Sequence, residues 1–262
     1  MALKKNNKER RKITGINLLQ ISTIAFFLIL MEYVVRSGKI SQIFLASPSQ
    51  IWKEFLYMNS HNLLWEHVII SVEEFLVGYS LSAIFGIALG LIFVMFPKVE
   101  EFLSSFCSAF MSIPKSAILP LLIIWFGIGF DSKVILIIMF CMFTILFNTT
   151  SGAKQTRVEH LKVASVFKAT RMQTLIHVII PSALPNIFTG LRISAATAFT
   201  SVIFAEMTAA RKGIGFLLSA SQQVFNTPRL FVILVVVTII SVILVQMVNV
   251  TEFMVCHKWR KI

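Results

Sequence analysis

The sequence predicts an all-α, polytopic membrane protein with six transmembrane helices. Only 14% of its 262 residues are charged, whereas 56% are hydrophobic and the mean hydropathy is +0.82. Soluble domains are about a quarter charged, so these charges are too few to cover a soluble globule of this size. Six apolar stretches are each long enough to cross a hydrocarbon core, and each must be helical because lipid offers no partner to free backbone groups.

The six expected spans lie at 16–35, 75–95, 104–126, 133–151, 187–207 and 230–250. A basic segment precedes the first span, as in a signal peptide, but that span has no small-x-small cleavage site. We therefore expect it to be retained. The segment 37–66 is too long for a bare turn. Ser47 can cap a helix that has Pro48 at its first position, which predicts a short helix on the outer surface.

Lysine and arginine predict the orientation. Both tails are basic, and so is the segment between the fourth and fifth spans, which carries Lys154, Arg157, Lys162, Lys168 and Arg171. Six crossings put all three on one side, which the positive-inside rule assigns to the cytoplasm. The net charge of +12 thus indicates membrane topology or anionic partners rather than nucleic acid.

We therefore expect four parts along the chain. They are a basic cytoplasmic tail (1–15), a first helix with an outer-surface segment (16–65), a membrane-spanning core with a cytoplasmic loop at 154–186 (66–252), and a second basic cytoplasmic tail (253–262).

No motif for catalysis or metal binding occurs. The histidines form neither H-x-x-x-H nor H-E-x-x-H, and neither G-x-S-x-G nor a glycine-rich phosphate loop is present. Cys107, Cys141 and Cys256 lack metal-ligand spacing. We expect no catalytic residue, no metal and no cofactor in this chain.

Three acidic residues lie near the ends of spans. Glu32 is close to the outer end of the first span, where we expect a solvated or hydrogen-bonded carboxylate rather than a buried site. Glu73 and Glu74 begin the second span. Adjacent helical residues point about 100° apart, so this pair does not converge, and we interpret both as interfacial.

The third span contains Pro114, Lys115 and Pro120, followed by two glycines. Proline bends a helix and frees backbone groups, which are tolerated where they face protein or a water-filled cavity. We expect a kinked helix that lines a translocation pathway, with a packing kink as the alternative. Lys115 would suit an anionic solute, and Glu206 at the end of the fifth span is a further pathway candidate. Gly86 and Gly90 in the second span predict close helix packing.

The loop from His160 to Pro181 alternates apolar and basic residues. This pattern favours two short amphipathic helices broken near Lys168–Thr170. Pro181 should end the second helix, and Pro185 should restart the chain toward the fifth span. Such a loop could lie on anionic lipid, or it could be a surface on which a partner docks.

This loop resembles the ATPase-coupling motif of bacterial ABC importer permeases. That motif has Glu-Ala-Ala, three residues, Gly, nine residues, and Ile-x-Leu-Pro. Here Lys162, Val163 and Ala164 stand at the first three places, Lys168 at the glycine and Pro181 at the end. The segments FLASPSQIW, IPKSAILPLLIIWFGIGFDSK and FAEMTAARKGIGFLLSA are similar to the nitrate, sulfonate, taurine and bicarbonate branch of these permeases.

The resemblance implies a type I ABC importer permease-like fold in the bacterial inner membrane, with both termini cytoplasmic. It also implies two permease copies, cytoplasmic ATPases that bind ATP-Mg, and an extracytoplasmic solute-binding protein. The ATPase-coupling residues would be Lys162, Val163, Ala164, Phe167, Lys168, Ala169, Thr170, Arg171 and Pro181.

The expected function is import of a small anionic solute: an aliphatic sulfonate, taurine, nitrate or bicarbonate. Related permeases carry neutral thiamine-precursor pyrimidines or riboflavin, which leaves those substrates as alternatives. An intramembrane lipid-processing enzyme, or a membrane scaffold or sensor, is the alternative from a different class. Lys162 and Lys168 depart from the family pattern. A left-handed turn at Lys168 would be unfavourable by about 1–2 kcal/mol compared with glycine. The two added positive charges suggest an acidic patch on the ATPase.

Overall fold

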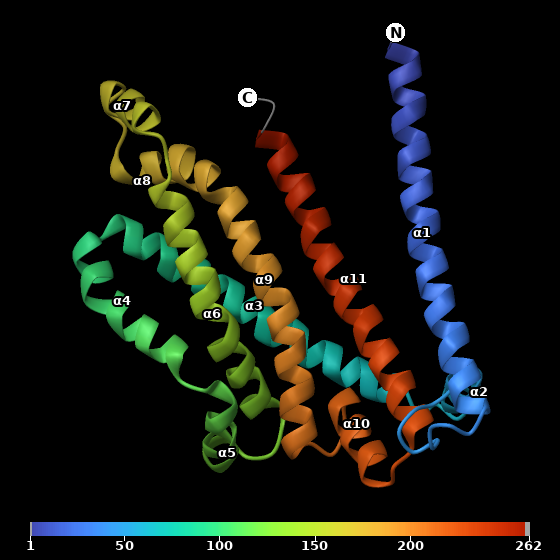
Figure 1. The fold of residues 1–262 in the computed structure, drawn as a ribbon. Coiled ribbons are helices and arrows are strands. Elements are labelled where there is room, and N and C mark those ends of the chain that lie inside the picture. Colours follow the sequence, from blue (N-terminus) through green and yellow to red (C-terminus); the bar gives the residue numbers. More distant parts are fainter. Residues whose placement is uncertain (1, 260–262) are drawn as a thin grey trace. The chain divides into compact units, whose positions relative to one another are not determined.

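The computed structural model describes residues 2–259, and within them the side chains of 19–114 and 117–256. Every regular element in this range is helical (Figure 1). The α-helices are α1 (Ala2–Arg36), α2 (Pro48–Ser60), α3 (Trp65–Met95), α4 (Pro97–Ser112), α5 (Lys115–Phe126), α6 (Phe130–Lys154), α7 (Val158–Val166), α8 (Arg171–Thr174), α9 (Ile180–Ala209), α10 (Ile214–Gln223) and α11 (Thr227–Trp259), with a π-helical turn η1 (Leu175–Ile179) between α8 and α9.

Five helices of the described chain are long and apolar enough to cross a membrane, and a sixth span results if α4 and α5 count as one broken span. We expected a single kinked helix at 104–126. Instead, α4 and α5 are bent by 103° relative to each other. Pro114 explains the break, because it disfavours helical backbone at the preceding residue, and Ile113 is extended (φ −68°, ψ 132°). Pro120 lies inside α5 without ending it.

The chain forms two compact units, Met1–Leu63 with Ala220–Val235, and Leu64–Ser219 with Val236–Ile262. In the first unit, Ser47 caps α2 in a capping box with Gln50, which confirms the predicted helix start. Glu32 accepts hydrogen bonds from the backbone N–H (3.0 Å) and the hydroxyl (2.7 Å) of Ser49 and pairs with Arg36, so its carboxylate is hydrogen-bonded as expected. Arg229 donates to Glu54 at 2.7 Å.

The second unit is built on α3, α6 and α9, and glycines allow these helices to approach closely. A Cβ at Gly86 would lie 2.7 Å from the carbonyl oxygen of Met142, and one at Gly90 would lie 2.7 Å from the Cβ of Thr149. Neither distance leaves room for a side chain, which confirms the packing interpretation of these two glycines.

The connection into α9 differs from the expectation. Helical structure is continuous from Arg171 to Ala209, so Pro181 ends no helix and Pro185 restarts none. The π-helical turn is the reason. Within it, the N–H of Ile180 donates to the oxygen of Leu175, five residues back. The wider turn places Pro181 in the first turn of α9, where its missing N–H leaves no bond unmade.

Candidate functional site

The turn between α7 and α8 is the first of two regions that could carry function. Lys168 has a φ of +52°, and three backbone hydrogen bonds close the turn around it. Ala169 N–H donates to Ala164 O (3.0 Å), Lys168 N–H to Ser165 O (2.9 Å), and Phe167 N–H to Val163 O (3.1 Å). The first two bonds define a Schellman motif, whose left-handed position is usually glycine. The predicted break at Lys168–Thr170 is confirmed, and the lysine keeps the conformation that glycine would favour.

The second helix of this turn also has a defined start. Thr170 accepts a hydrogen bond from the backbone N–H of Gln173, and the Gln173 side chain accepts one from the Thr170 N–H at 2.8 Å. This capping box satisfies donors at the start of α8, which has only four residues. The turn is thus held in place by its own backbone and caps.

The side chains of this turn point away from the protein. Val166 and Phe167 are 79% and 80% exposed, whereas Ala164 is 9% exposed. The basic residues here are exposed, and within the described residues they form no ion pair. We call this region the α7–α8 surface, defined by Lys162, Val163, Val166, Phe167, Lys168 and Arg171. It is both apolar and positively charged.

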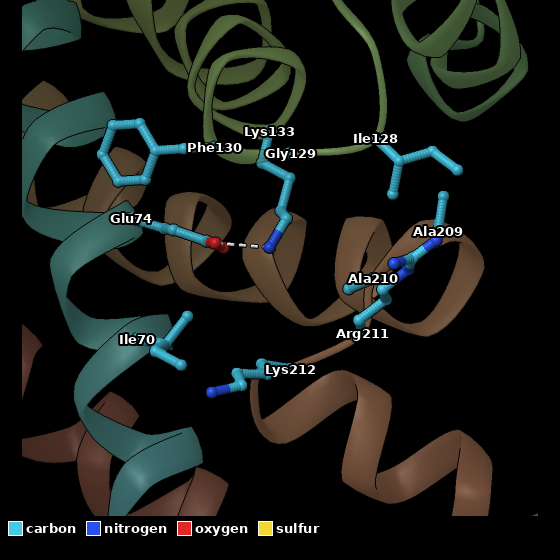
Figure 2. A pocket seen from close by; sticks show the side chains of 10 residues that line it. All are labelled: Ile70, Glu74, Ile128, Gly129, Phe130, Lys133, Ala209, Ala210, Arg211 and Lys212. Carbon is cyan, nitrogen blue, oxygen red and sulfur yellow. Dashed lines mark hydrogen bonds and ion pairs between the residues drawn. The ribbon is translucent and has the colours of Figure 1, made fainter.

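A cavity of about 550 Å³ lies at the start of α6 and the end of α9, and Figure 2 shows the side chains that line it. In Figure 1 these helix ends lie opposite the ends nearest α7 and α8. Helices of 25 and 30 residues separate the two regions by about 37–45 Å at 1.5 Å per residue. The walls of the 550 Å³ cavity are formed by the first part of α3, the 128–133 segment and the 209–212 turn. Most of the lining is apolar. The charged lining residues are Glu74, Lys133, Arg211 and Lys212.

Two of these charged residues are buried as an ion pair. Glu74 of α3 and Lys133 of α6 are 2% and 6% exposed, and the Lys133 ammonium donates to Oε1 of Glu74. The interfacial interpretation of Glu74 is therefore wrong. Glu73 is exposed, so the predicted divergence of the two side chains does occur. Lys133 was missed because its partner lies 59 residues away in the sequence.

Glu206 of α9 is almost fully buried beside this pair, and it holds the turn that leads into α10. Its carboxylate accepts hydrogen bonds from the Ser71 hydroxyl (2.6 Å) and the backbone N–H of Gly215 (2.7 Å). Ser71 in turn accepts the N–H of Ile214 at 2.8 Å, and His67 Nδ1 accepts that of Gly213 at 2.9 Å. Side chains of α3 and α9 thus bind three successive N–H groups.

The other predicted pathway residues lie elsewhere. Pro114 and Pro120 are exposed and line neither this cavity nor a smaller one beside the α7–α8 surface. The side chain of Lys115 lies outside the described residues. That smaller cavity, about 370 Å³, is lined by the end of α3, the start of α4, and residues including Ala169 and Arg171. Two predicted coupling residues therefore line a cavity.

Comparisons with known proteins agree with this architecture. Residues 82–252 match the family described as "Binding-protein-dependent transport system inner membrane component". The chain is 30% identical to the taurine transport system permease protein of Escherichia coli, over 86% of this chain and 84% of that one. It is also 30% identical to the riboflavin transport system permease protein of Chloroflexus aurantiacus, over 88% and 86%.

Solved structures resemble the fold. An inward-facing structure of the MetNI methionine ABC transporter matches with a TM-score of 0.58 at 17% identity, over 74% of this chain and 93% of that one. An amino acid ABC transporter crystallised with histidines matches with a TM-score of 0.61 at 17% identity, over 76% and 97%. The family match covers more than half of the chain and the taurine permease match most of it, so the chain belongs to the family of inner membrane components of binding-protein-dependent transport systems.

Proposed function

We propose that this permease component serves an ATP-driven importer of a small anionic solute of the aliphatic sulfonate, taurine, nitrate or bicarbonate class. Relatives named for taurine, aliphatic sulfonate and nitrate transport support this class. The chain itself is not catalytic, because it is the transport component. In such systems a partner ATPase hydrolyses ATP. The alternative of an intramembrane lipid-processing enzyme is therefore set aside.

The α7–α8 surface carries the proposal. The apolar side chains of Val166 and Phe167 are about four-fifths exposed, and a Schellman motif and a capping box hold their turn in place. Exposed apolar groups on an ordered turn indicate a surface that a partner covers. We assign that partner as the cytoplasmic ATPase. This assignment places both termini in the cytoplasm, the 550 Å³ cavity on the outer side and the binding protein outside. A second permease copy would complete the pathway.

The continuity of helix from α8 to α9 supplies a route for coupling. A displacement of α8 by the ATPase would move one helical rod that runs from Arg171 to Ala209 and ends beside Glu206. Packed helices respond to such displacements as rigid bodies with discrete arrangements. ATP-driven closure of the ATPases would thereby shift the spans between inward-open and outward-open states.

A second candidate substrate class is neutral. The riboflavin relative, and a formylaminopyrimidine permease relative from Halalkalibacterium halodurans at 27% identity, support it. The cavity favours the anionic class instead. Lys133 is paired with Glu74 and Lys212 with Glu66, which leaves Arg211 as the lining cation without an ion pair among the described residues.

Transport by the reconstituted complex tests the proposal. The chain is placed in vesicles with its ATPase and binding protein, and uptake of a radiolabelled sulfonate is measured with and without ATP. We expect ATP-dependent accumulation. Accumulation that persists after residues 158–174 are replaced by a short linker would contradict the coupling role.

Charge reversal tests the contact with the ATPase more sharply. Lys162→Glu and Lys168→Glu should weaken co-purification of the ATPase, because two positive charges beside exposed apolar groups predict an acidic patch on the partner. Lys53→Glu, an exposed lysine of α2 in the expected outer-surface segment, is the matched control. Unchanged assembly and uptake in both reversals would discard the acidic patch.

A further inference from the structure

The segment that joins α9 to α10 is held in place by side chains of other elements. Gly213 precedes α10, and the first N–H groups of a helix have no partner inside it. Gly213 has no side chain that could cap them. The N–H groups of Gly213, Ile214 and Gly215 donate instead to His67 (2.9 Å), Ser71 (2.8 Å) and Glu206 (2.7 Å), respectively. The caps of α10 therefore come from α3 and α9.

His67 differs from the other two caps because its ability to accept depends on protonation. A backbone N–H only donates, so Nδ1 of His67 is the acceptor and carries no proton. A protonated imidazole has an N–H on both nitrogens and accepts no hydrogen bond. The ordinary pKa of histidine, about 6.5, lets the side chain change its charge between about pH 5 and 8. The bond to Gly213 therefore exists only while the ring is neutral.

The ring of His67 contacts the joining segment at two points. Besides accepting the N–H of Gly213, it stacks on Phe216 in the first turn of α10, with the ring centroids 6.0 Å apart. The stacking partner is uncharged and does not distinguish the neutral ring from the protonated one by charge. The hydrogen bond to Gly213 is thus the contact that depends on the protonation of His67.

Two opposite charges lie near this ring. Among the described residues, Glu66 of α3 and Lys212 of the turn act on His67, and they are paired with each other. Glu66 favours the protonated ring, whereas Lys212 opposes it. Glu206, the acid of α9, already accepts hydrogen bonds from a serine hydroxyl and a backbone N–H. The charges around His67 therefore oppose each other, and the hydrogen bond selects the neutral ring.

The joining segment is also a wall of the 550 Å³ cavity. Residues 209–212 line the cavity, and Gly213 follows them directly (Figure 2). Without the bond to His67, the hydroxyl of Ser71 and the carboxylate of Glu206 still hold α10, but the N–H next to the cavity wall loses its acceptor. The position of this wall therefore depends on His67.

We propose that His67 is a positioning residue whose neutral ring keeps the cavity wall at 209–213 in place for transport, so that uptake falls when the outer medium is acidified. The inference rests on the proposed function, which puts this cavity on the outer side. The net contribution of one hydrogen bond corresponds to about a three- to tenfold change in an equilibrium. We expect uptake to fall by about that factor between about pH 7.5 and 5.5.

Uptake into vesicles of controlled outer pH tests this role. The permease and its ATPase are reconstituted with ATP inside at about pH 7.5, and the binding protein and a radiolabelled sulfonate are added outside at about pH 7.5 or 5.5. His67→Asn separates the two states of the ring, because its Oδ1 can accept the N–H of Gly213 and does not titrate. We expect the wild type to lose uptake in acid and His67→Asn to retain it.

Two further variants define the effect. His67→Leu has no acceptor at either pH, so its uptake should be low and insensitive to pH. His61→Asn is the matched control, because His61 is an exposed histidine whose Nδ1 lies 2.8 Å from the carbonyl oxygen of Tyr57. This variant should be as sensitive to acid as the wild type. The same binding protein is used throughout, so any effect of acid on that partner is common to all variants.

Thermal unfolding in detergent gives a readout that needs no substrate. Between about pH 7.5 and 5.5, the wild type should lose more stability than His67→Asn, because only the histidine gives up its bond to Gly213. Equal sensitivity to acid of these two proteins would overturn the proposal, and so would wild-type uptake by His67→Leu at the higher pH. If His67→Leu does not fold, the comparison of the wild type with His67→Asn decides alone. Absence of ATP-dependent uptake by the wild type at both pH values would instead count against the proposed function.

Discussion

Two regions of this mostly apolar protein carry charged residues. One is the polar end of the helix bundle, defined by Glu74 of α3, Lys133 of α6 and Glu206 of α9, and the other is the α7–α8 surface. The charged side chains are buried in the first region and exposed in the second. Glu74, Lys133 and Glu206 are nearly fully buried and bound to neighbouring groups, whereas Lys162, Lys168 and Arg171 are exposed and without ion pairs among the described residues. A buried charge must find its partner within the chain. An exposed charge is solvated by water and can also bind a partner from outside the chain.

This difference predicts the largest loss of stability at the polar end. Lys133→Met leaves the Glu74 carboxylate buried without its cation, which should lower the free energy of unfolding by about 3–5 kcal/mol. Thermal unfolding of the detergent-solubilised protein measures the loss. Lys212→Met breaks the exposed pair with Glu66 and should have a much smaller effect. Equal losses would mean that burial does not distinguish the two pairs.

Substitution in the Gly213–Gly215 turn, which hydrogen-bonds to Glu206, should cause the next largest loss of stability. Gly213 has a φ of +116°, and a Cβ there would lie 2.1 Å from Oε1 of Glu206. Gly213→Ala should lower the free energy of unfolding by about 1–3 kcal/mol, because it strains the backbone and displaces the carboxylate. Gly129→Ala is the matched control in another turn, where no atom lies within 4 Å. A greater loss at Gly129 would contradict the role of this turn.

At the α7–α8 surface, removing the strained side chain should increase stability slightly. Lys168→Gly relieves about 1–2 kcal/mol of left-handed strain but adds about 0.5–1 kcal/mol of unfolded-state entropy, so the net gain should be about 1 kcal/mol or less. Lys162→Gly, inside α7, should have the opposite sign. Chemical denaturation of both variants measures the difference. Destabilisation by Lys168→Gly would show that the side chain itself supports the turn.

The smallest effect on stability is expected at the most exposed apolar residues. Val166→Ser and Phe167→Ser should change the free energy of unfolding by no more than about 0.5 kcal/mol, because neither side chain is buried. Co-purification of the ATPase should nevertheless fall. Normal ATPase binding by both variants would indicate that this surface contacts lipid instead.

Local patterns predicted much of this fold. The apolar stretches predicted five of the six expected spans as single long helices, and the third expected span is broken into α4 and α5. The Ser47-Pro48 pair predicted the start of α2, and the spacing to Lys168 predicted the break between two short helices. In each case the cause lies within a few residues of the effect, as in a cap or a turn. Phe167 is exposed, and its contact with a partner stays a prediction.

Other features required contacts that the sequence does not display. Nothing near Pro181 indicates the π-helical turn that carries the helix through it, and nothing near Pro114 gives the 103° bend. The largest omission was the pairing of Glu74 with Lys133, which joins two helices across 59 residues. The pattern of α3 alone predicts Glu74 at the membrane–water interface, because it contains no information about the neighbouring helix α6.

The sequence by itself determined that the chain is helical, crosses a membrane repeatedly and exposes a basic, apolar turn, because hydropathy and backbone preference act over short distances. Tertiary structure alone decided which charges are buried together and which side chains bind the turn between α9 and α10. That choice depends on how closely α3, α6 and α9 approach, since burial removes water as a partner and leaves each charge dependent on the neighbouring helix.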